Sequence, residues 1–101
     1  MLKVAVLVSG GGSNLQSILD YEQDSFKVEM VIGSKDGIYG LERAKNAEVP
    51  TYVVSRKEYG NETSNKILEL TRGKVDLIVL AGYLSILDGE ILKEFKDRII
   101  N

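Results

Sequence analysis

Short runs of Val, Ile and Leu alternate along this chain with segments whose apolar residues recur at helical spacing. The runs are nearly continuous, which is typical of strands buried on both faces of a parallel sheet. The expected strands are residues 2–9, 28–34, 51–54, 75–81 and 98–101, and the expected helices are residues 13–21, 40–47, 61–72 and 88–95. This alternation predicts an α/β fold with helices on both faces of the sheet.

Right-handed crossovers limit the topology to a doubly wound, Rossmann-like sheet with the strand order 3-2-1-4-5. In that order the first and fourth strands are neighbours, and ligands bind in the crevice at their carboxyl ends. Residues 1–101 are expected to form a single nucleotide-phosphate-binding domain. Because the last strand pattern stops at Asn101, we expect the domain to be truncated at its C-terminus, with an open sheet edge that makes self-association plausible.

The composition excludes several classes of function. Thirteen Lys and Arg against fifteen Asp and Glu give a net charge of −2, which predicts no nucleic-acid partner. Cysteine and histidine are both absent from the chain, so acid–base chemistry would need Asp, Glu, Lys or Tyr, and we expect no metal. No apolar segment approaches the roughly 18 residues of a membrane span. A cytoplasmic protein without a membrane partner is expected.

Three consecutive glycines, Gly10, Gly11 and Gly12, separate the first strand from the first helix. Free amides and the positive end of a helix dipole attract anions there, and glycine lets a phosphate come close. A P-loop is excluded because this segment has no Lys, and a dinucleotide fingerprint fails because Leu15 stands where its third glycine belongs. The segment therefore favours a single phosphate, and the alternative is a tight turn without a ligand.

The segment after the fourth strand is apolar and contains Leu84, Ser85, Ile86 and Leu87. A segment with apolar side chains at the switch point suits the binding of a flat heteroaromatic ring. The alternative is that these side chains only pack against the last helix. Asn101 ends the fifth strand, where its amide either faces the crevice or has no role; the residues alone leave both alternatives open.

Four stretches together resemble the phosphoribosylglycinamide formyltransferase family. They are SGGGSNLQSI (residues 9–18), GLERA (residues 40–44), VDLIVLAGYLSIL (residues 75–87) and RIIN (residues 98–101). The combination is specific, whereas each piece alone is not. The resemblance runs over the whole chain and covers about the N-terminal half of a typical member.

The resemblance implies transfer of a formyl group from 10-formyltetrahydrofolate to the amino group of glycinamide ribonucleotide, in purine synthesis. It implies a phosphate site at Gly11, Gly12, Ser13 and Asn14, a folate pocket at Leu84, Ser85, Ile86 and Leu87, and a catalytic residue at Asn101. In the family this Asn is followed two residues later by a catalytic His, and later by an Asp. Neither is present here, so we expect the chain alone to lack transferase activity.

Three positions depart from the family pattern. Many members carry Asn in place of Gly11, Arg in place of Ser85 and a basic residue near Glu62. These departures affect the folate side more than the phosphate side. Two other functions stay open: a formyltetrahydrofolate hydrolase, and a ribose-phosphate-binding module without catalysis.

Overall fold

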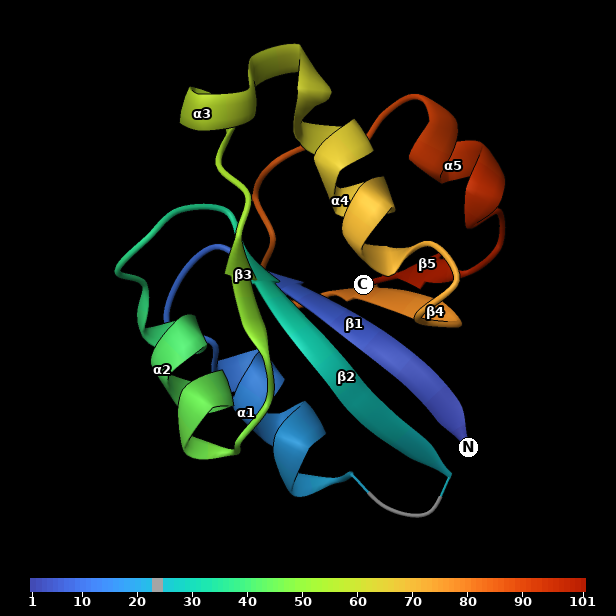
Figure 1. Cartoon of the computed structure of the whole chain (residues 1–101). Helices are drawn as coiled ribbons and strands as arrows, with labels where there is room; N and C mark the ends of the chain where they lie inside the picture. Colours follow the sequence, from blue (N-terminus) through green and yellow to red (C-terminus); the bar gives the residue numbers. More distant parts are fainter. Residues whose placement is uncertain (23–24) are drawn as a thin grey trace.

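The computed structural model describes residues 1–22 and 25–101. In these two ranges, five parallel strands form one sheet of order β3-β2-β1-β4-β5 (Figure 1). The strands are β1 (Leu2–Val8), β2 (Phe26–Gly33), β3 (Thr51–Val53), β4 (Leu77–Leu80) and β5 (Ile99–Ile100). The predicted fold class and strand order are confirmed.

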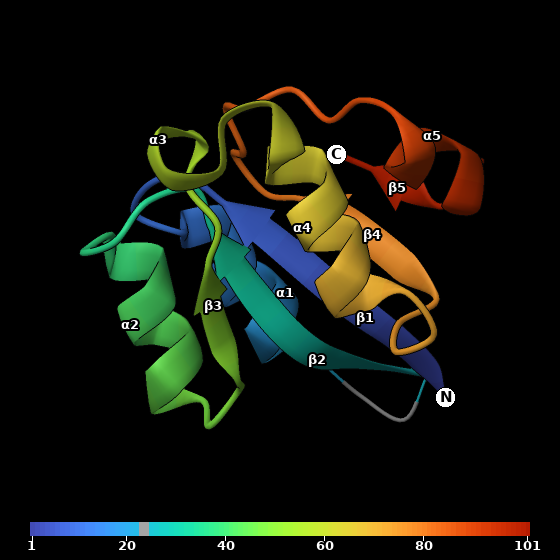
Figure 2. The ribbon, with the colours of Figure 1, turned by 45° about the horizontal axis from the view of Figure 1, so that its top comes forward.

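The helices lie in two layers, one on each face of the sheet (Figures 1 and 2). One face packs against α1 (Ser13–Asp20) and α2 (Tyr39–Asn46), and the other packs against α4 (Thr63–Thr71) and α5 (Glu90–Glu94). Strand β1 explains the continuous apolar run, because its alternate side chains enter two different cores. Val4, Val6 and Val8 belong to the α1–α2 core, and Ala5 and Leu7 belong to the α4–α5 core.

The helix predicted over residues 61–72 is shorter than expected and is preceded by two further helical turns. A short helix α3 (Arg56–Tyr59) and a 3₁₀ turn η1 (Gly60–Glu62) come before α4. Ser55 caps α3 by accepting a hydrogen bond from the Glu58 amide at 3.2 Å. The positive φ of Gly60, 53°, separates α3 from the turn that follows. The sequence pattern missed α3 because its four polar residues have no apolar periodicity.

Two helices begin directly after a glycine with a positive φ and have no side-chain cap. Helix α1 begins at Ser13 after a left-handed Gly12, and α5 begins at Glu90 after Gly89, whose φ is 76°. Neither Ser13 nor Asp88 therefore occupies the capping position. The Asp88 amide instead donates to the buried Ser64 hydroxyl at 2.9 Å, which ties the start of α5 to α4.

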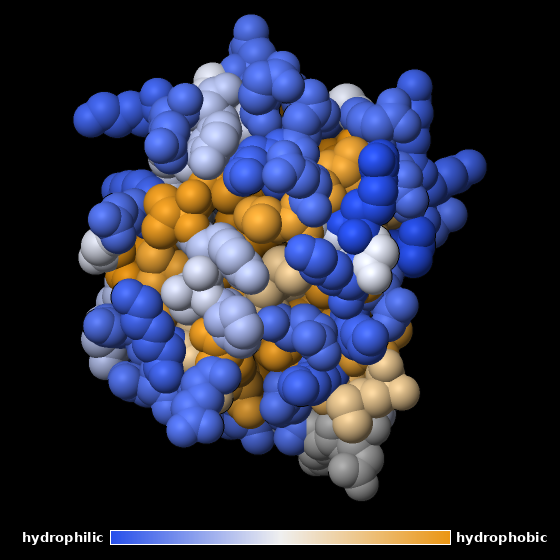
Figure 3. All heavy atoms as spheres, in the orientation of Figure 1, coloured by the Kyte–Doolittle hydropathy of each residue, from blue (hydrophilic) through white to orange (hydrophobic). Residues whose placement is uncertain are grey.

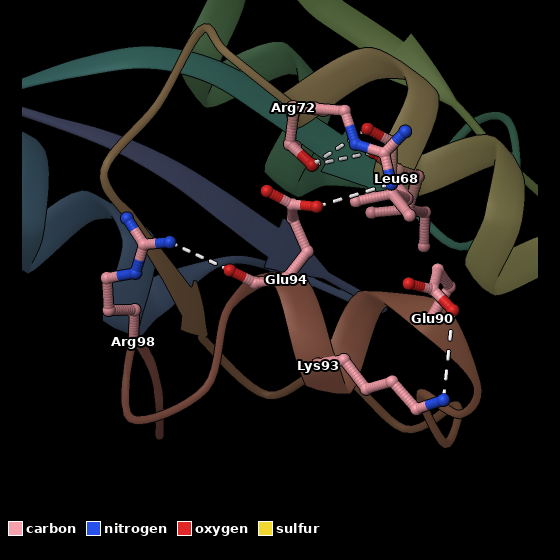
Figure 4. Close-up of polar contacts among 8 residues, drawn as sticks. Leu68, Arg72, Glu90, Lys93, Glu94 and Arg98 are labelled. Atoms are coloured by element: carbon pink, nitrogen blue, oxygen red, sulfur yellow. Dashed lines mark hydrogen bonds and ion pairs between the residues drawn. The ribbon is translucent and has the colours of Figure 1, made fainter.

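Polar contacts join α4, α5 and β5 (Figure 4). The Arg72 guanidinium lies 3.3 Å from the Glu94 carboxylate, and Arg98 donates to the Glu94 carbonyl oxygen at 2.7 Å. The first pair is largely exposed and contributes little stability by itself. Together the two contacts fix the direction in which the chain enters β5 and reaches Asn101.

Hydrophilic side chains form most of the rim of the face seen in Figure 3, and apolar atoms show between them over its middle. None of the helices in the described ranges is long and apolar enough to cross a bilayer.

Candidate functional site

The candidate site lies at the carboxyl ends of β1 and β4, where the strand order reverses. These strands pair with Leu7 opposite Leu80, so the segments that follow them emerge side by side. We refer to residues 9–12 as the glycine loop and to residues 82–87 as the apolar loop. The buried Ser9 hydroxyl joins them: it accepts hydrogen bonds from the Leu84 amide at 2.8 Å and from the Ser34 hydroxyl at 2.9 Å.

Helix α2 sets the direction of two peptide units in the glycine loop. The Gly40 amide donates to the Gly10 carbonyl oxygen at 3.0 Å, and the Arg43 Nε donates to the Gly11 carbonyl oxygen at 2.7 Å. In a trans peptide the carbonyl and the following N–H point in opposite directions. The amides of Gly11 and Gly12 are therefore turned away from α2.

The amides from Gly11 to Leu15 donate no hydrogen bond to any residue in the described part of the chain. The next amide, that of Gln16, starts the helical pattern by donating to the Gly12 carbonyl oxygen at 2.8 Å. A Cβ added at Gly10 or Gly11 would have no atom within 4 Å, so the outer side of the loop is open. Unpaired amides at the start of a helix, facing open space, can bind an anion.

The third glycine has a different role from the first two. Gly12 has a φ of +77°, and a Cβ there would lie 2.7 Å from the Gly40 Cα atom. The glycine loop and the start of α2 are thus in direct backbone contact, through Gly12 and Gly40. Arg43 completes this contact, since its guanidinium also donates to the Gln16 side chain at 3.2 Å and stacks over the Tyr39 ring at 4.8 Å.

Side chains of the apolar loop point alternately into and out of the protein. Tyr83 and Leu87 pack against the α4–α5 core. Leu84 and Ile86 are 85% and 77% exposed, although the sequence left open that they pack against the last helix. For these two residues that alternative is wrong, whereas for Leu87 the packing is real. Two exposed aliphatic side chains can pack against the face of an apolar ring.

Arg56 connects α3 to the apolar loop. Its Nη2 donates to the Ile86 carbonyl oxygen at 3.0 Å. The Tyr83 hydroxyl nearby is buried and has no hydrogen-bond partner among the described residues. Burial raises the pKa of this phenol, and the Ser85 side chain beside it and the Arg56 charge offset part of the rise. A phenol with a raised pKa stays protonated near neutral pH and can donate a hydrogen bond.

Asn101 follows β5 directly and is exposed. Ile100 pairs with Val79, so Asn101 lies level with Leu80. Leu80 in turn pairs with Leu7, at the carboxyl end of β1. Asn101 is therefore on the same edge of the sheet as both loops. No group of three or more metal-ligating side chains lies close together within residues 1–22 and 25–101.

The model of the family described as formyl transferase matches residues 2–101. The chain belongs to the formyl transferase family. It is 42% identical to the phosphoribosylglycinamide formyltransferase of Haemophilus influenzae over all of this chain and 50% of that protein. It is 40% identical to the trifunctional purine biosynthetic protein adenosine-3 of Drosophila melanogaster, over 98% of this chain and 8% of that protein.

Among solved structures, this formyl transferase chain is similar to glycinamide ribonucleotide transformylase 1 of Symbiobacterium toebii. The two superpose with a TM-score of 0.91 at 35% identity, over 98% of this chain and 50% of that one. The chain thus spans about half the length of the single-function relatives it matches.

The structure adds four residues to the candidate site that sequence reasoning did not single out: Ser9, Gly40, Arg43 and Arg56. A signal existed for Gly40, because a glycine within a helical pattern often marks a close approach of another segment. No local pattern could have found the Arg56 contact, since it bonds a residue 30 positions away.

Proposed function

We propose that this chain is the substrate-phosphate-binding part of an enzyme that transfers a formyl group to glycinamide ribonucleotide in purine biosynthesis. One observation carries the proposal: the amides of Gly11 to Leu15 are unpaired among the described residues, and α2 turns two of them toward open space. The family and the printed names of its relatives support the reaction.

The phosphate of the ribonucleotide binds at Gly11, Gly12, Ser13 and Asn14. A monoester dianion accepts several hydrogen bonds at once, and the backbone amides supply them in a fixed geometry. The positive end of α1 adds a favourable charge interaction of about 0.3–1 kcal/mol. The exposed hydroxyl of Ser13 and amide of Asn14 provide further donors.

The folate cosubstrate, 10-formyltetrahydrofolate, binds along the apolar loop. Leu84 and Ile86 offer exposed aliphatic surface to its ring, while Ser85 and the backbone beside it offer hydrogen-bonding groups. Leu87 supports the loop from the core side. The residues present therefore fit a flat ring with polar edges. Arg56 supplies a positive charge on this side, where the family pattern led us to expect a basic residue near Glu62.

Formyl transfer requires stabilisation of a negative oxygen in the tetrahedral intermediate formed when the substrate amine attacks the formyl carbon. The side-chain amide of Asn101 donates a hydrogen bond to that oxygen. Proton transfer to the departing folate amine needs an acid–base group, and the family's histidine has no counterpart among these 101 residues. We therefore expect ligand binding but no turnover from this chain alone.

Calorimetry with glycinamide ribonucleotide and with a non-reactive folate analogue tests the proposal. Binding of both ligands is the expected result, together with no formyl transfer when substrate and cosubstrate are mixed with the chain. Binding of ribose phosphates without any folate affinity would instead assign the chain to the non-catalytic module. Turnover close to that of a full-length relative would contradict the predicted inactivity.

A further inference from the structure

One buried side chain lies between the two loops of the candidate site. Ser9 directly follows β1 and is 8% exposed. Its hydroxyl oxygen accepts hydrogen bonds from the Leu84 amide in the apolar loop, at 2.8 Å, and from the hydroxyl of Ser34, which directly follows β2, at 2.9 Å. The segments after three neighbouring strands, β2, β1 and β4, therefore meet at one oxygen atom.

The apolar loop has few other hydrogen bonds to its backbone. Within residues 82–87, only the Leu84 amide donates a hydrogen bond to a residue that the structure describes. The Ile86 carbonyl oxygen accepts the bond from Arg56, closer to the other end of the loop. The bond between Leu84 and Ser9 therefore sets where the exposed Leu84 side chain lies relative to β1.

The glycine loop starts from the same residue. Gly10 follows Ser9, and the amides without a partner among the described residues begin at Gly11. The phosphate site proposed above is thus two residues away from the side chain that holds the apolar loop. Both proposed ligand sites are placed relative to Ser9.

We propose that Ser9 is a positioning residue, whose hydroxyl sets the distance between the phosphate held at the glycine loop and the ring held at the apolar loop. The inference rests on the proposed function. Formyl transfer requires the substrate amine to meet the formyl carbon, so the two ligands must be held at a fixed separation, and a displacement of about 1 Å can slow such a reaction by about 100-fold. A change at Ser9 should therefore affect the two ligands together more than either ligand alone.

The experiment measures how well one compound occupies both sites. The compound joins glycinamide ribonucleotide, through its amino nitrogen, to N10 of a non-reactive folate analogue by one carbon in place of the formyl carbon. Calorimetry gives its dissociation constant and those of the two separate ligands. The product of the two separate constants, divided by the constant of the joined compound, is the effective concentration of one group at its site once the other is bound. This ratio falls when the two sites shift relative to each other.

For Ser9→Ala we expect the effective concentration to fall at least about tenfold, because the Leu84 amide loses its acceptor and the apolar loop shifts toward water. The affinity for the separate folate analogue should fall less than this ratio. The affinity for glycinamide ribonucleotide should change by less than about twofold, because none of the unpaired amides of the glycine loop is bonded to Ser9.

Ser34→Ala is the matched control. It removes the other hydrogen bond to the Ser9 oxygen and leaves the one from Leu84. The Ser34 amide still donates to the Val8 carbonyl oxygen at 2.9 Å, so the backbone after β2 keeps its place. The effective concentration should stay within about twofold of the value for the unchanged chain.

Two variants of Leu84 test the same bond from its other side. Leu84→Pro removes the amide hydrogen and Leu84→Ala keeps it, while both replace the exposed leucine side chain. Only Leu84→Pro should lower the effective concentration. This pair decides the question if Ser9→Ala does not fold.

The inference and the proposed function fail in different ways. Equal effective concentrations in Ser9→Ala and Ser34→Ala, or in the two Leu84 variants, would contradict the inference and leave the proposed function in place. The same holds if both separate ligands bind the unchanged chain and the joined compound binds no more tightly than either. If neither separate ligand binds the unchanged chain, the proposed function is wrong and the inference falls with it.

Discussion

The glycine loop and the apolar loop lie at neighbouring strand ends, but the protein holds them in different ways. The three glycines of the glycine loop lie against α2, through a backbone contact between Gly12 and Gly40 and through hydrogen bonds that α2 donates to the carbonyl oxygens of Gly10 and Gly11. The apolar loop is held by hydrogen bonds to two separate segments, through Ser9 and Arg56. The close approach of Gly12 to Gly40 depends on the absence of side chains, and the Arg43 side chain adds a hydrogen bond to it. The support of the apolar loop depends on the Ser9 and Arg56 side chains.

This difference predicts how each loop responds to substitution. A side chain added at Gly12 cannot be accommodated without moving α2, because the contact between Gly12 and Gly40 is formed by backbone atoms on both sides. A change in the apolar loop depends on whether the side chain points into the core or out to solvent. The predictions below separate the two kinds of support.

The largest effect is expected for Gly12→Asp. A side chain at a φ of +77° and 2.7 Å from the Gly40 Cα atom must displace α2, and the carboxylate repels a phosphate. We expect a loss of about 2–4 kcal/mol in the free energy of unfolding and no detectable binding of ribose phosphates. Urea unfolding and calorimetry measure both. Gly11→Ala is the control, since its Cβ would meet open space. If this variant loses as much unfolding free energy, the contact between Gly12 and α2 is not the cause of the destabilisation.

Leu87→Ser should cost about 1–3 kcal/mol of unfolding free energy, because Leu87 packs against the α4–α5 core. Ile86→Ser should change stability by less than about 0.5 kcal/mol, because Ile86 is 77% exposed. The folate analogue should nevertheless bind more weakly to the Ile86→Ser variant. Thermal unfolding and calorimetry on both variants check this. Equal destabilisation by the two substitutions would contradict the alternation of inward and outward side chains in the apolar loop.

Arg43→Ala removes the hydrogen bond to the Gly11 carbonyl oxygen and the stacking over Tyr39. We expect the affinity for ribose phosphates to fall about tenfold, equivalent to about 1.4 kcal/mol, with folate-analogue affinity unchanged. Lys45→Ala removes an exposed positive charge from the same helix and serves as the control. If both variants lose the same affinity, the effect is one of net charge and not of loop geometry.

The smallest effect is expected for Tyr83→Phe, which removes a buried hydroxyl without a hydrogen-bond partner among the described residues. At neutral pH we expect a stability change within about 1 kcal/mol, in either direction. Burial raises the pKa of this phenol above its ordinary value, so above that value the unfolded chain loses the proton first and stability falls as pH rises. The variant should show a shallower alkaline decrease; an identical pH profile would contradict the raised pKa.

The sheet was predictable because its signal is local and repeated. Strand β1 shows this: every residue from Val4 to Val8 is buried, so the apolar run identifies a central parallel strand directly. The purpose of Gly12 was only partly predictable. Its local conformation suits a loop before a helix, but the contact with Gly40 joins residues 28 positions apart and depends on how α2 packs.

The apolar loop was less predictable than the glycine loop. Leu84, Ile86 and Leu87 look alike in the sequence, and only the direction of the backbone decides that the first two face solvent. Helix α3 was missed for a related reason, since its four residues form a turn that is stabilised by the Ser55 cap and by the hydrogen bond from Arg56 to the distant Ile86 carbonyl oxygen.

The most direct test is a titration of the isotope-labelled chain with ribose 5-phosphate, followed through the amide resonances. The account predicts that the amides of Gly11, Gly12, Ser13 and Asn14 shift together and saturate with one dissociation constant, while those of α4 and α5 stay in place. Saturable shifts elsewhere with none at these four amides would contradict it.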